Sequence, residues 1–501
     1  MKKKIIIIGG GFGGLAVGCR LAALGHDIEI FEQRDKPGGC AYAYELNGFR
    51  FDGGPSSITA PFLLNDIFAA AGRNREDYFK LLPVNPFYRI FDSTGRSFDY
   101  NNDLEFTLGE IEKWNPADKE GYERLIEATG QIFEKAFIEL ADKPFLSVRG
   151  MMAALPTLLR IQSFQNAHAF VSRYIKNEFL RSVFSFHPLL IGGSPFESSS
   201  IYALAQALER EWGLWYAEGG TGAIVDGLAR LFAELGGKIH TGAAVAEILV
   251  EGRRVNGVRL AAGSVHRADI VVANSDAAAT YTGLIPARYR RVNTDARYQR
   301  LRYSHSLFVI YFGTRCRYTG PAAAGGAKRE LAHHNLILGP HHREQMAATF
   351  DRQELSSDLT LFLNLPGLTD PSAAPEGCEA FTAIAPVPNL GGKIDWEKGA
   401  RPYRDRILQL LEDNYLPGLR ANIVTEHVID PLHFQNTLGS YRGAAYSVRP
   451  VLSQTAWFRP HNRSEDFENL YLVGAGTHPG AGLPGVLSSA VIVENLIQEA
   501  G

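Results

Sequence analysis

The chain has 501 residues, of which 45% are hydrophobic and 21% are charged, values that are ordinary for a globular protein of about two domains. Its formal net charge of −3 gives no reason to expect nucleic acid as a partner. The four cysteines are scattered and form neither a disulfide framework nor a metal-ligand spacing, so no metal is expected. No secretory signal and no run of about 18 apolar residues is visible, which predicts a cytoplasmic protein without a spanning helix.

The N-terminus predicts a strand–helix–strand unit that binds a dinucleotide. Four consecutive isoleucines suit a parallel strand buried on both faces, and Gly9, Gly11 and Gly14 follow in G-x-G-x-x-G spacing. Gly9 permits the tight turn, Gly11 lets the backbone approach a pyrophosphate, and Gly14 lets the helix pack on the strand. A second strand leads to Glu32, an acid suited to accept hydrogen bonds from a ribose diol.

Two glycine-rich segments follow this unit and are expected to lie close to the cofactor. The first contains Gly38 and Gly39, and the second runs from residue 47 to residue 55. Residues 219–274 then contain a further glycine turn, a helix, two short strands and a buried strand. This order indicates that the chain returns to the nucleotide-binding domain after an intervening segment.

The intervening residues 60–215 have helical periodicity and many aromatic residues, which predicts a largely helical insertion. Within it, residues 150–164 are apolar with few acids and are core, a tunnel lining or a membrane-facing patch. Glu209, Glu211 and Glu218 lie near two tryptophans. One of these acids is a candidate base or gate, whereas most of them are expected to lie on a solvated face of a helix.

The rest of the chain predicts a mixed sheet and a second cofactor-binding segment. Residues 295–435 alternate strand-like runs with turns, as in a sheet with one face wide enough to floor a pocket. A strand near residue 470 enters a loop rich in glycine and proline, and an apolar helix runs from Val486 to about Ile497. This loop and the positive end of that helix suit the pyrophosphate, ribityl chain and ring of a flavin.

Several stretches resemble the bacterial-type phytoene desaturases over nearly the whole chain. The most specific is Asn469–Ser489, with Gly474-Ala-Gly-Thr-His-Pro-Gly-Ala-Gly; further matches lie at 51–55, 209–216, 219–222, 385–388 and 454–460. The resemblance implies FAD as cofactor, a long apolar carotenoid substrate and dehydrogenation at allylic carbons. It also implies peripheral attachment to the membrane that dissolves the substrate, at the inner face of the cell membrane.

The fold class expected is α/β, with a Rossmann-type FAD-binding domain of the glutathione-reductase and amine-oxidase kind, a mixed-sheet substrate domain and a helical insertion. The expected discontinuous FAD-binding domain comprises residues 1–80, 219–290 and 440–501. The helical insertion, with a possible membrane-associated part, covers 81–218, and the substrate-binding domain covers 291–439.

The expected cofactor-binding residues combine the dinucleotide unit with the later glycine segments. They are Gly9, Gly11, Gly14, Glu32, Gly38, Gly39, Gly54, Val245, Gly474, Gly476, Gly485 and Val486. Two departures from the family pattern stand out. Cys40 occupies a position where the family usually has arginine, and Gly150 and Ala153 replace polar residues in a segment where only Arg149 carries over.

Desaturation removes a hydride and a proton from adjacent carbons. Arg149 is the candidate cation for stabilising developing charge, with a structural arginine as the alternative. His478 is the candidate base by position, although a ring that packs within the glycine loop is favoured over catalysis. No second G-x-G-x-x-G unit for a nicotinamide is present, so a quinone or oxygen is expected as the electron acceptor.

The function expected is FAD-dependent desaturation of phytoene stepwise toward lycopene. One alternative is another carotenoid desaturase, oxygenase or isomerase of the same family, acting on a diapocarotenoid or hydroxycarotenoid. A second is an amine-oxidase-like enzyme with a soluble substrate, and a third is a binding module like the Rab escort and dissociation-inhibitor proteins. The exact substrate, the number of desaturation steps and the oligomeric state do not follow from the sequence.

Overall fold

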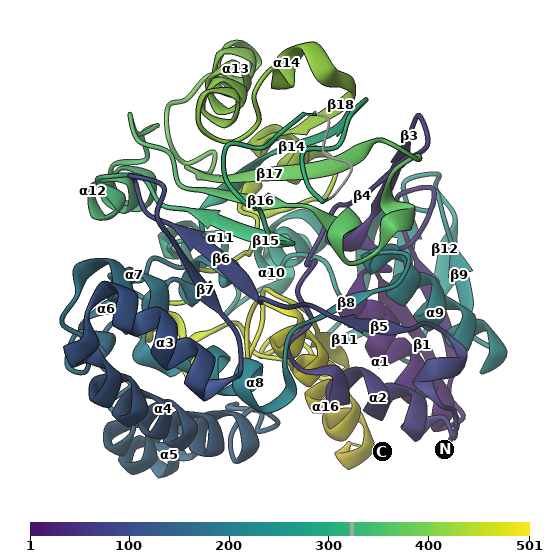
Figure 1. Ribbon diagram of the computed structural model, residues 1–501. Helices are drawn as coiled ribbons and strands as arrows, with labels where there is room; N and C mark the ends of the chain where they lie inside the picture. The colour runs from purple at the N-terminus through teal and green to yellow at the C-terminus, as the bar shows by residue number, and fades with distance from the viewer. Residues whose placement is uncertain (321–324, 501) are drawn as a thin grey trace.

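The computed structural model describes residues 1–320 and 325–500 of the chain. A five-stranded parallel sheet forms the centre of the part that contains both termini, and its strands come from the beginning, middle and end of the sequence (Figure 1). In spatial order they are β19 (Leu470–Leu472), β13 (Ile270–Ala273), β1 (Lys4–Ile8), β2 (Asp27–Phe31) and β9 (Lys238–His240).

The isoleucine run of β1 is buried because both faces of this sheet are covered. Ile5 and Ile7 pack in the core formed with helices on one face, whereas Ile6 and Ile8 pack against an antiparallel three-stranded sheet on the other. The helices are α1 (Phe12–Ala23), α2 (Pro61–Ala70), α9 (Thr221–Glu234) and α16 (Leu483–Glu499). The small sheet contains β10 (Val245–Glu251), β11 (Arg254–Leu260) and β12 (Val265–Arg267).

A second, seven-stranded mixed sheet lies above the parallel sheet in Figure 1. In strand β14 (Ser306–Thr314), Leu307, Val309 and Tyr311 alternate with Phe308 and Ile310, which pack in a core with helix α13 (Trp396–Asn414). In spatial order the strands are β18 (Ile423–Ile429), β14 (Ser306–Thr314), β17 (Glu379–Val387), β16 (Leu361–Asn364), β15 (His334–Ile337), β6 (Tyr88–Phe91) and β7 (Ser97–Tyr100). The face opposite α13 is therefore available to a cavity.

A helical part lies beside these two sheets, at the lower left of Figure 1. Its helices are α3 (Leu104–Trp114), α4 (Lys119–Phe133), α5 (Val148–Arg160), α6 (Ala167–Val171), α7 (Glu178–Ser185) and α8 (Leu204–Trp212). Two short ribbons connect the parts: β3 (Ala43–Leu46) with β4 (Phe49–Asp52), and β5 (Leu81–Pro83) with β8 (Trp215–Ala217). The remaining helices are α10 (Ala277–Ala279), α11 (Asp295–Arg300), α12 (His342–Ala347), α13 (Trp396–Asn414), α14 (Leu419–Asn422) and α15 (Pro431–Asn436).

The α/β class and the mixed second sheet are confirmed, and so is the N-terminal strand–helix–strand unit. The last helix begins at Leu483, before the predicted Val486, because Gly482 occupies the N-cap and Pro484 suits a first turn where no N–H is needed. The range predicted as a helical insertion also contains β6 and β7, which belong to the seven-stranded sheet.

Candidate functional site

A large cavity of about 710 Å³ lies where the parallel sheet, the seven-stranded sheet and the helical part meet. One region is lined by the N-terminal glycine turn (residues 9–14) and by the C-terminal glycine loop, which come from opposite ends of the chain. The other region is lined mainly by apolar side chains of β14, β17 and the helical part. The cavity therefore combines a backbone-rich, polar cradle with an apolar slot, a combination typical of a site for a cofactor and an apolar substrate.

The N-terminal glycine turn places the N-terminus of α1 against the cavity. Gly11 occupies the N-cap and has no side chain to cap the helix, so the N–H groups of the first turn suit a phosphate group. Gly14 does not line the cavity, and a Cβ atom there would lie 2.1 Å from the carbonyl oxygen of Gly9. Gly14 thus serves the close packing of α1 on the turn, the task that the spacing predicts for it.

Glu32 follows β2 and lines the same region of the cavity, with only 4% of its surface exposed. Its Oε2 accepts a hydrogen bond of 2.8 Å from the Gly10 N–H, and its Oε1 accepts one of 2.9 Å from the Arg34 N–H. Backbone donors therefore hold the carboxylate beside the phosphate-binding turn. This position suits hydrogen bonds to the hydroxyl groups of a ribose.

Gly38, Gly39 and Gly54 also line the cavity, as do the β10 residue Val245 and the thiol-bearing Cys40. The Gly38 N–H donates to the Gly10 carbonyl over 2.9 Å, which fixes this loop to the phosphate-binding turn. Gly39 has a positive φ of 56°, and a Cβ at Gly54 would lie 2.6 Å from the carbonyl oxygen of Cys40. The two glycine segments therefore pack against each other with no room for side chains.

The C-terminal loop closes the cavity from the other side. Gly474, Gly476, Gly485 and Val486 all line it, and Gly482 at the N-cap of α16 leaves that helix without a side-chain cap. The N-terminus of α16 thus presents a positive dipole end to the cavity, as the sequence predicts. The N-terminal glycine turn and the C-terminal loop meet at Asn274, a residue that sequence reasoning missed. A Cβ at Gly13 or Gly474 would lie within 3.0 Å of its Oδ1 atom.

Arg459 is a second residue that sequence reasoning missed, although it lies in one of the resembling stretches. The side chain is 1% exposed and holds the C-terminal loop from behind. Its Nε donates to the Thr477 carbonyl over 2.9 Å and its Nη2 donates to the Ala475 carbonyl over 2.7 Å. Asn462 adds hydrogen bonds of 2.8 Å to Thr477 Oγ1 and to the His478 carbonyl. These contacts fix the loop as a rigid wall of the cavity.

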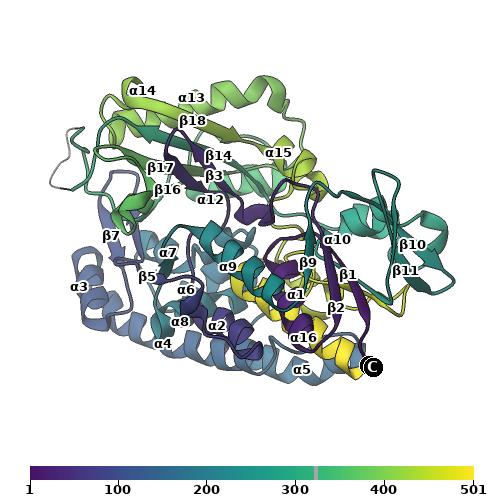
Figure 2. The same cartoon turned by 90° about the vertical axis from the view of Figure 1, so that its right-hand side faces the viewer.

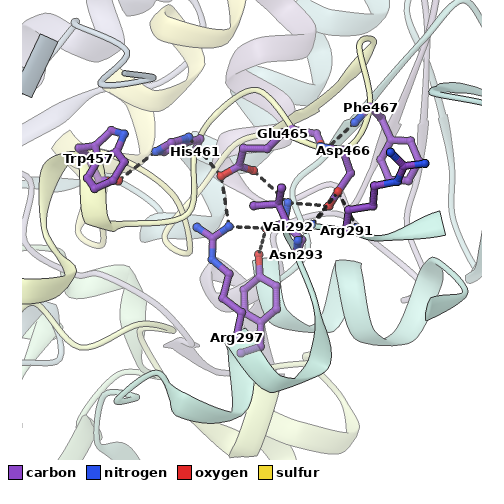
Figure 3. Close-up of polar contacts among 11 residues, drawn as sticks. Arg291, Val292, Asn293, Arg297, Trp457, His461, Glu465, Asp466 and Phe467 are labelled. Atoms are coloured by element: carbon purple, nitrogen blue, oxygen red, sulfur yellow. Dashed lines mark hydrogen bonds and ion pairs between the residues drawn. The ribbon is translucent and has the colours of Figure 1, made fainter. Parts of the chain in front are cut away.

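Figure 3 shows how the segment that carries Arg459 is itself anchored. His461 contacts the Trp457 carbonyl at 2.9 Å and the Glu465 carboxylate at 3.2 Å, and Glu465 forms an ion pair with Arg297. Asp466 accepts hydrogen bonds from the backbone N–H groups of residues 291–293. Burial opposes ionisation of Asp466, but these backbone donors outweigh it and lower the pKa of this carboxyl group.

His478 lines the cavity and is 7% exposed, and its ring meets that of Phe145 edge-on at 5.1 Å. Neither ring nitrogen has a hydrogen-bond partner among the described residues. Burial, with a smaller contribution from the Arg459 charge, lowers the pKa of His478 to about 3. The ring is therefore neutral at physiological pH, and its predicted role as a base stays a prediction.

Arg149 lies apart from the residues that surround the cavity. It is exposed at the start of α5 and does not line the cavity, so the structure does not bring it together with the glycine segments. Its predicted role as a cation near the reacting carbons stays a prediction. A different arginine, the buried Arg459, contacts the C-terminal loop directly.

Comparison with known proteins identifies the family. The family model described as flavin containing amine oxidoreductase matches residues 12–493. The chain belongs to this family. It is 47% identical over 501 residues to a lycopene-forming phytoene desaturase of Pseudescherichia vulneris and 44% identical over 498 residues to one of Pantoea ananas, covering 99% of both chains in each case.

A solved structure described as an oxidoreductase from Methanosarcina mazei has the same fold, with a TM-score of 0.64 at 18% identity, over 99% of this chain and 100% of that one. The resemblance to the phytoene desaturases is thus confirmed, and the chain is an FAD-dependent oxidoreductase.

The cavity fits FAD on the evidence of its own residues. Two helix N-termini without side-chain caps face it, one from each end of the chain. Glycines line the positions where side chains would obstruct the backbone, and a backbone-held carboxylate lies at Glu32. The α1 region suits the ADP half, and the C-terminal loop suits the flavin half.

Proposed function

We propose that the protein dehydrogenates phytoene in several steps to form lycopene. The observation that supports this most directly is the apolar slot that continues from the FAD cradle, with side chains of β14 and β17 along one wall. The relatives of 47% and 44% identity, which align over 99% of the chain, have this activity in their names. A long hydrocarbon is the kind of substrate that such a slot binds, because its affinity comes from burial of apolar surface.

The residues divide the work between binding and orientation. Bound FAD supplies the hydride acceptor when two hydrogens leave adjacent carbons. We propose that Gly9, Gly11 and Glu32 hold its ADP half, together with Gly38, Gly39, Gly54 and Val245. Gly14 contributes indirectly, because it lets α1 pack closely on the phosphate-binding turn. We propose that Gly474, Gly476, Gly485 and Val486 hold its flavin half. The apolar walls exclude water and align the substrate carbons beside this cradle.

The pigment assay tests this function. Cells that make phytoene are given the gene, and their pigments are separated and analysed by mass. Red lycopene, eight hydrogens lighter than phytoene after four desaturation steps, is the expected product. A gain of oxygen or an unchanged mass would instead indicate an oxygenase or an isomerase. Unaltered phytoene in cells that contain the folded yellow protein would refute the proposal.

We also propose that α5 attaches the protein to the inner face of the cell membrane. No helix in residues 1–320 or 325–500 is both long and apolar enough to cross a bilayer. The outer side of α5 carries a row of exposed apolar side chains, named here the α5 stripe: Val148, Met152, Leu155 and Leu159. Figure 2 shows α5 along one edge of the molecule. Leu158, a buried residue of the same helix, lines the cavity, so the stripe lies next to a route for a lipid-dissolved substrate.

We propose that a quinone or oxygen reoxidises the flavin. The first dinucleotide unit is already assigned to FAD, and a membrane quinone is within reach of a protein that lies on the bilayer. Turnover without oxygen, started by adding a quinone, tests this. Turnover that needs a nicotinamide instead would contradict it.

The division into an FAD-binding domain (1–80, 219–290 and 440–501), a helical insertion (81–218) and a substrate-binding domain (291–439) is kept as a proposal. The cores support it in outline, since the parallel sheet and α16 share one hydrophobic core and β14 and α13 share another.

A further inference from the structure

A buried polar cluster lies in the wall of the mainly apolar slot. His187, Glu209 and Tyr88 all line the cavity and are 4%, 1% and 2% exposed. His187 Nε2 lies 3.0 Å from Glu209 Oε2, and the Tyr88 hydroxyl donates to Glu209 Oε1 over 3.0 Å. A carboxylate in an apolar slot is costly to desolvate, which favours a functional reason for its presence.

Glu209 differs from the other carboxylates that line the cavity. Among the described residues these are Glu32, Asp52 and Asp276, and each accepts hydrogen bonds from backbone N–H groups. A backbone N–H cannot accept a proton, so such contacts fix a carboxylate in place. Among the residues that the structure describes, Glu209 is held only by the side chains of Tyr88 and His187, and of these the imidazole is able to gain a proton.

His187 differs from the other cavity histidines in the same way. His305, His333, His334 and His478 have no carboxylate partner in residues 1–320 and 325–500, and burial lowers the pKa of each one, to about 4 for His305 and His334. A second proton on any of these rings would be a buried, unpaired charge. Only His187, among the described histidines of the cavity, lies beside a carboxylate that stabilises an imidazolium.

The contact with Glu209 engages only one of the two ring nitrogens of His187. A carboxylate next to Nε2 favours the tautomer that carries its proton there, which leaves a lone pair on Nδ1. Nδ1 is buried and has no hydrogen-bond partner among the described residues. The arrangement of carboxylate, imidazole and free ring nitrogen is the one that makes a histidine a general base.

We infer that His187 is the catalytic base that takes the proton from the substrate, with Glu209 and Tyr88 as its positioning residues. The inference rests on the proposed function. One C–H bond of the substrate gives its hydride to bound FAD, and the adjacent carbon gives its proton to Nδ1 of His187. The electron pair of that second C–H bond becomes the new C=C bond. Glu209 stabilises the imidazolium until the proton leaves to solvent between steps.

The test compares variants of the FAD-loaded protein in steady-state desaturation, with FAD content and lycopene binding measured separately. H187A is expected to lose at least ~100-fold in kcat, the usual contribution of a general base. Added imidazoles should restore the rate, and more strongly as their basicity rises. E209Q is expected to lower kcat with little change in KM, and E209D to recover part of the rate.

The matched control is E379Q, because Glu379 is also buried but lies outside the cavity, where it accepts hydrogen bonds from the Tyr318 N–H and the Thr319 hydroxyl. E379Q should desaturate at the wild-type rate. H187A or E209Q with full FAD, normal lycopene binding and a rate within threefold of wild type would overturn the inference. So would rescue that is independent of imidazole basicity.

Two further outcomes keep the inference separable from the proposed function. If H187A and E209Q do not load FAD, Y88F decides, since it removes only a hydroxyl and should lower kcat about tenfold; an unchanged rate overturns the inference. A wild-type protein that leaves phytoene unaltered refutes the proposed function instead.

Discussion

Replacement of Gly14 by alanine tests the packing on which the FAD cradle depends. The added Cβ would lie 2.1 Å from the carbonyl oxygen of Gly9, whereas ordinary contacts begin near 3.4 Å, so the helix or the turn would have to move by about 1.3 Å. Neither moves easily, because the neighbouring Leu15 and Val17 of α1 are fully buried in the core. Such overpacking costs about 1–3 kcal/mol.

Gly109 provides the matched control within another helix, α3. It is exposed, and a Cβ at this position would meet no atom within 4 Å. G109A should therefore stabilise the protein by up to about 1 kcal/mol, since alanine favours a helix more than glycine does. The same chemical change is thus expected to act with opposite sign at the two positions.

The assays are the midpoint of urea unfolding and the ratio of flavin absorbance to protein absorbance after purification. G14A should unfold at lower urea and lose most of its FAD, because displacement of the Gly9 carbonyl distorts the phosphate-binding turn. G109A should keep full FAD and unfold at equal or higher urea. A G14A protein with full FAD and the wild-type midpoint would refute the reasoning about this contact.

Three further predictions concern pH, the C-terminal loop and the membrane. The pKa of His478 is about 3 in the folded protein and about 6.5 in the unfolded chain, so the unfolded chain takes up the proton first as the pH drops. The free energy of unfolding therefore decreases, by about 2 kcal/mol for this residue between pH 7 and pH 5. H478N should show a smaller decline of the urea midpoint, and an identical decline would contradict this. R459M leaves buried carbonyl groups without hydrogen bonds, which destabilises the folded loop by about 1–3 kcal/mol for each carbonyl. The variant should therefore release FAD on gel filtration, and retained flavin would count against the role of Arg459. The double variant M152E/L159E should no longer sediment with anionic liposomes, whereas V265E, at a similarly exposed site on the three-stranded sheet, should still sediment with them. Equal binding by all variants would rule out the α5 stripe as the membrane-attachment site.

The sequence alone determined the nucleotide-binding unit and the C-terminal loop. These features are local: an isoleucine run, glycines at fixed spacing and an acid after the second strand each have a conformational reason within a few residues. The structure has this strand–helix–strand unit, and the predicted glycines other than Gly14 line the cavity. Gly14 packs the helix instead, which the spacing also predicts.

Only the tertiary structure decided which polar side chains face the cavity. Glu209, Glu211 and Glu218 are similar in sequence, yet Glu209 is buried beside His187 whereas the other two are exposed. Arg149 carries a family resemblance but lies outside the cavity, and Arg459 lies behind the C-terminal loop. Burial and pairing of such groups depend on contacts between separate segments, as with Tyr88 and Glu209, which are 121 residues apart, and neither spacing nor hydrophobic periodicity records those contacts.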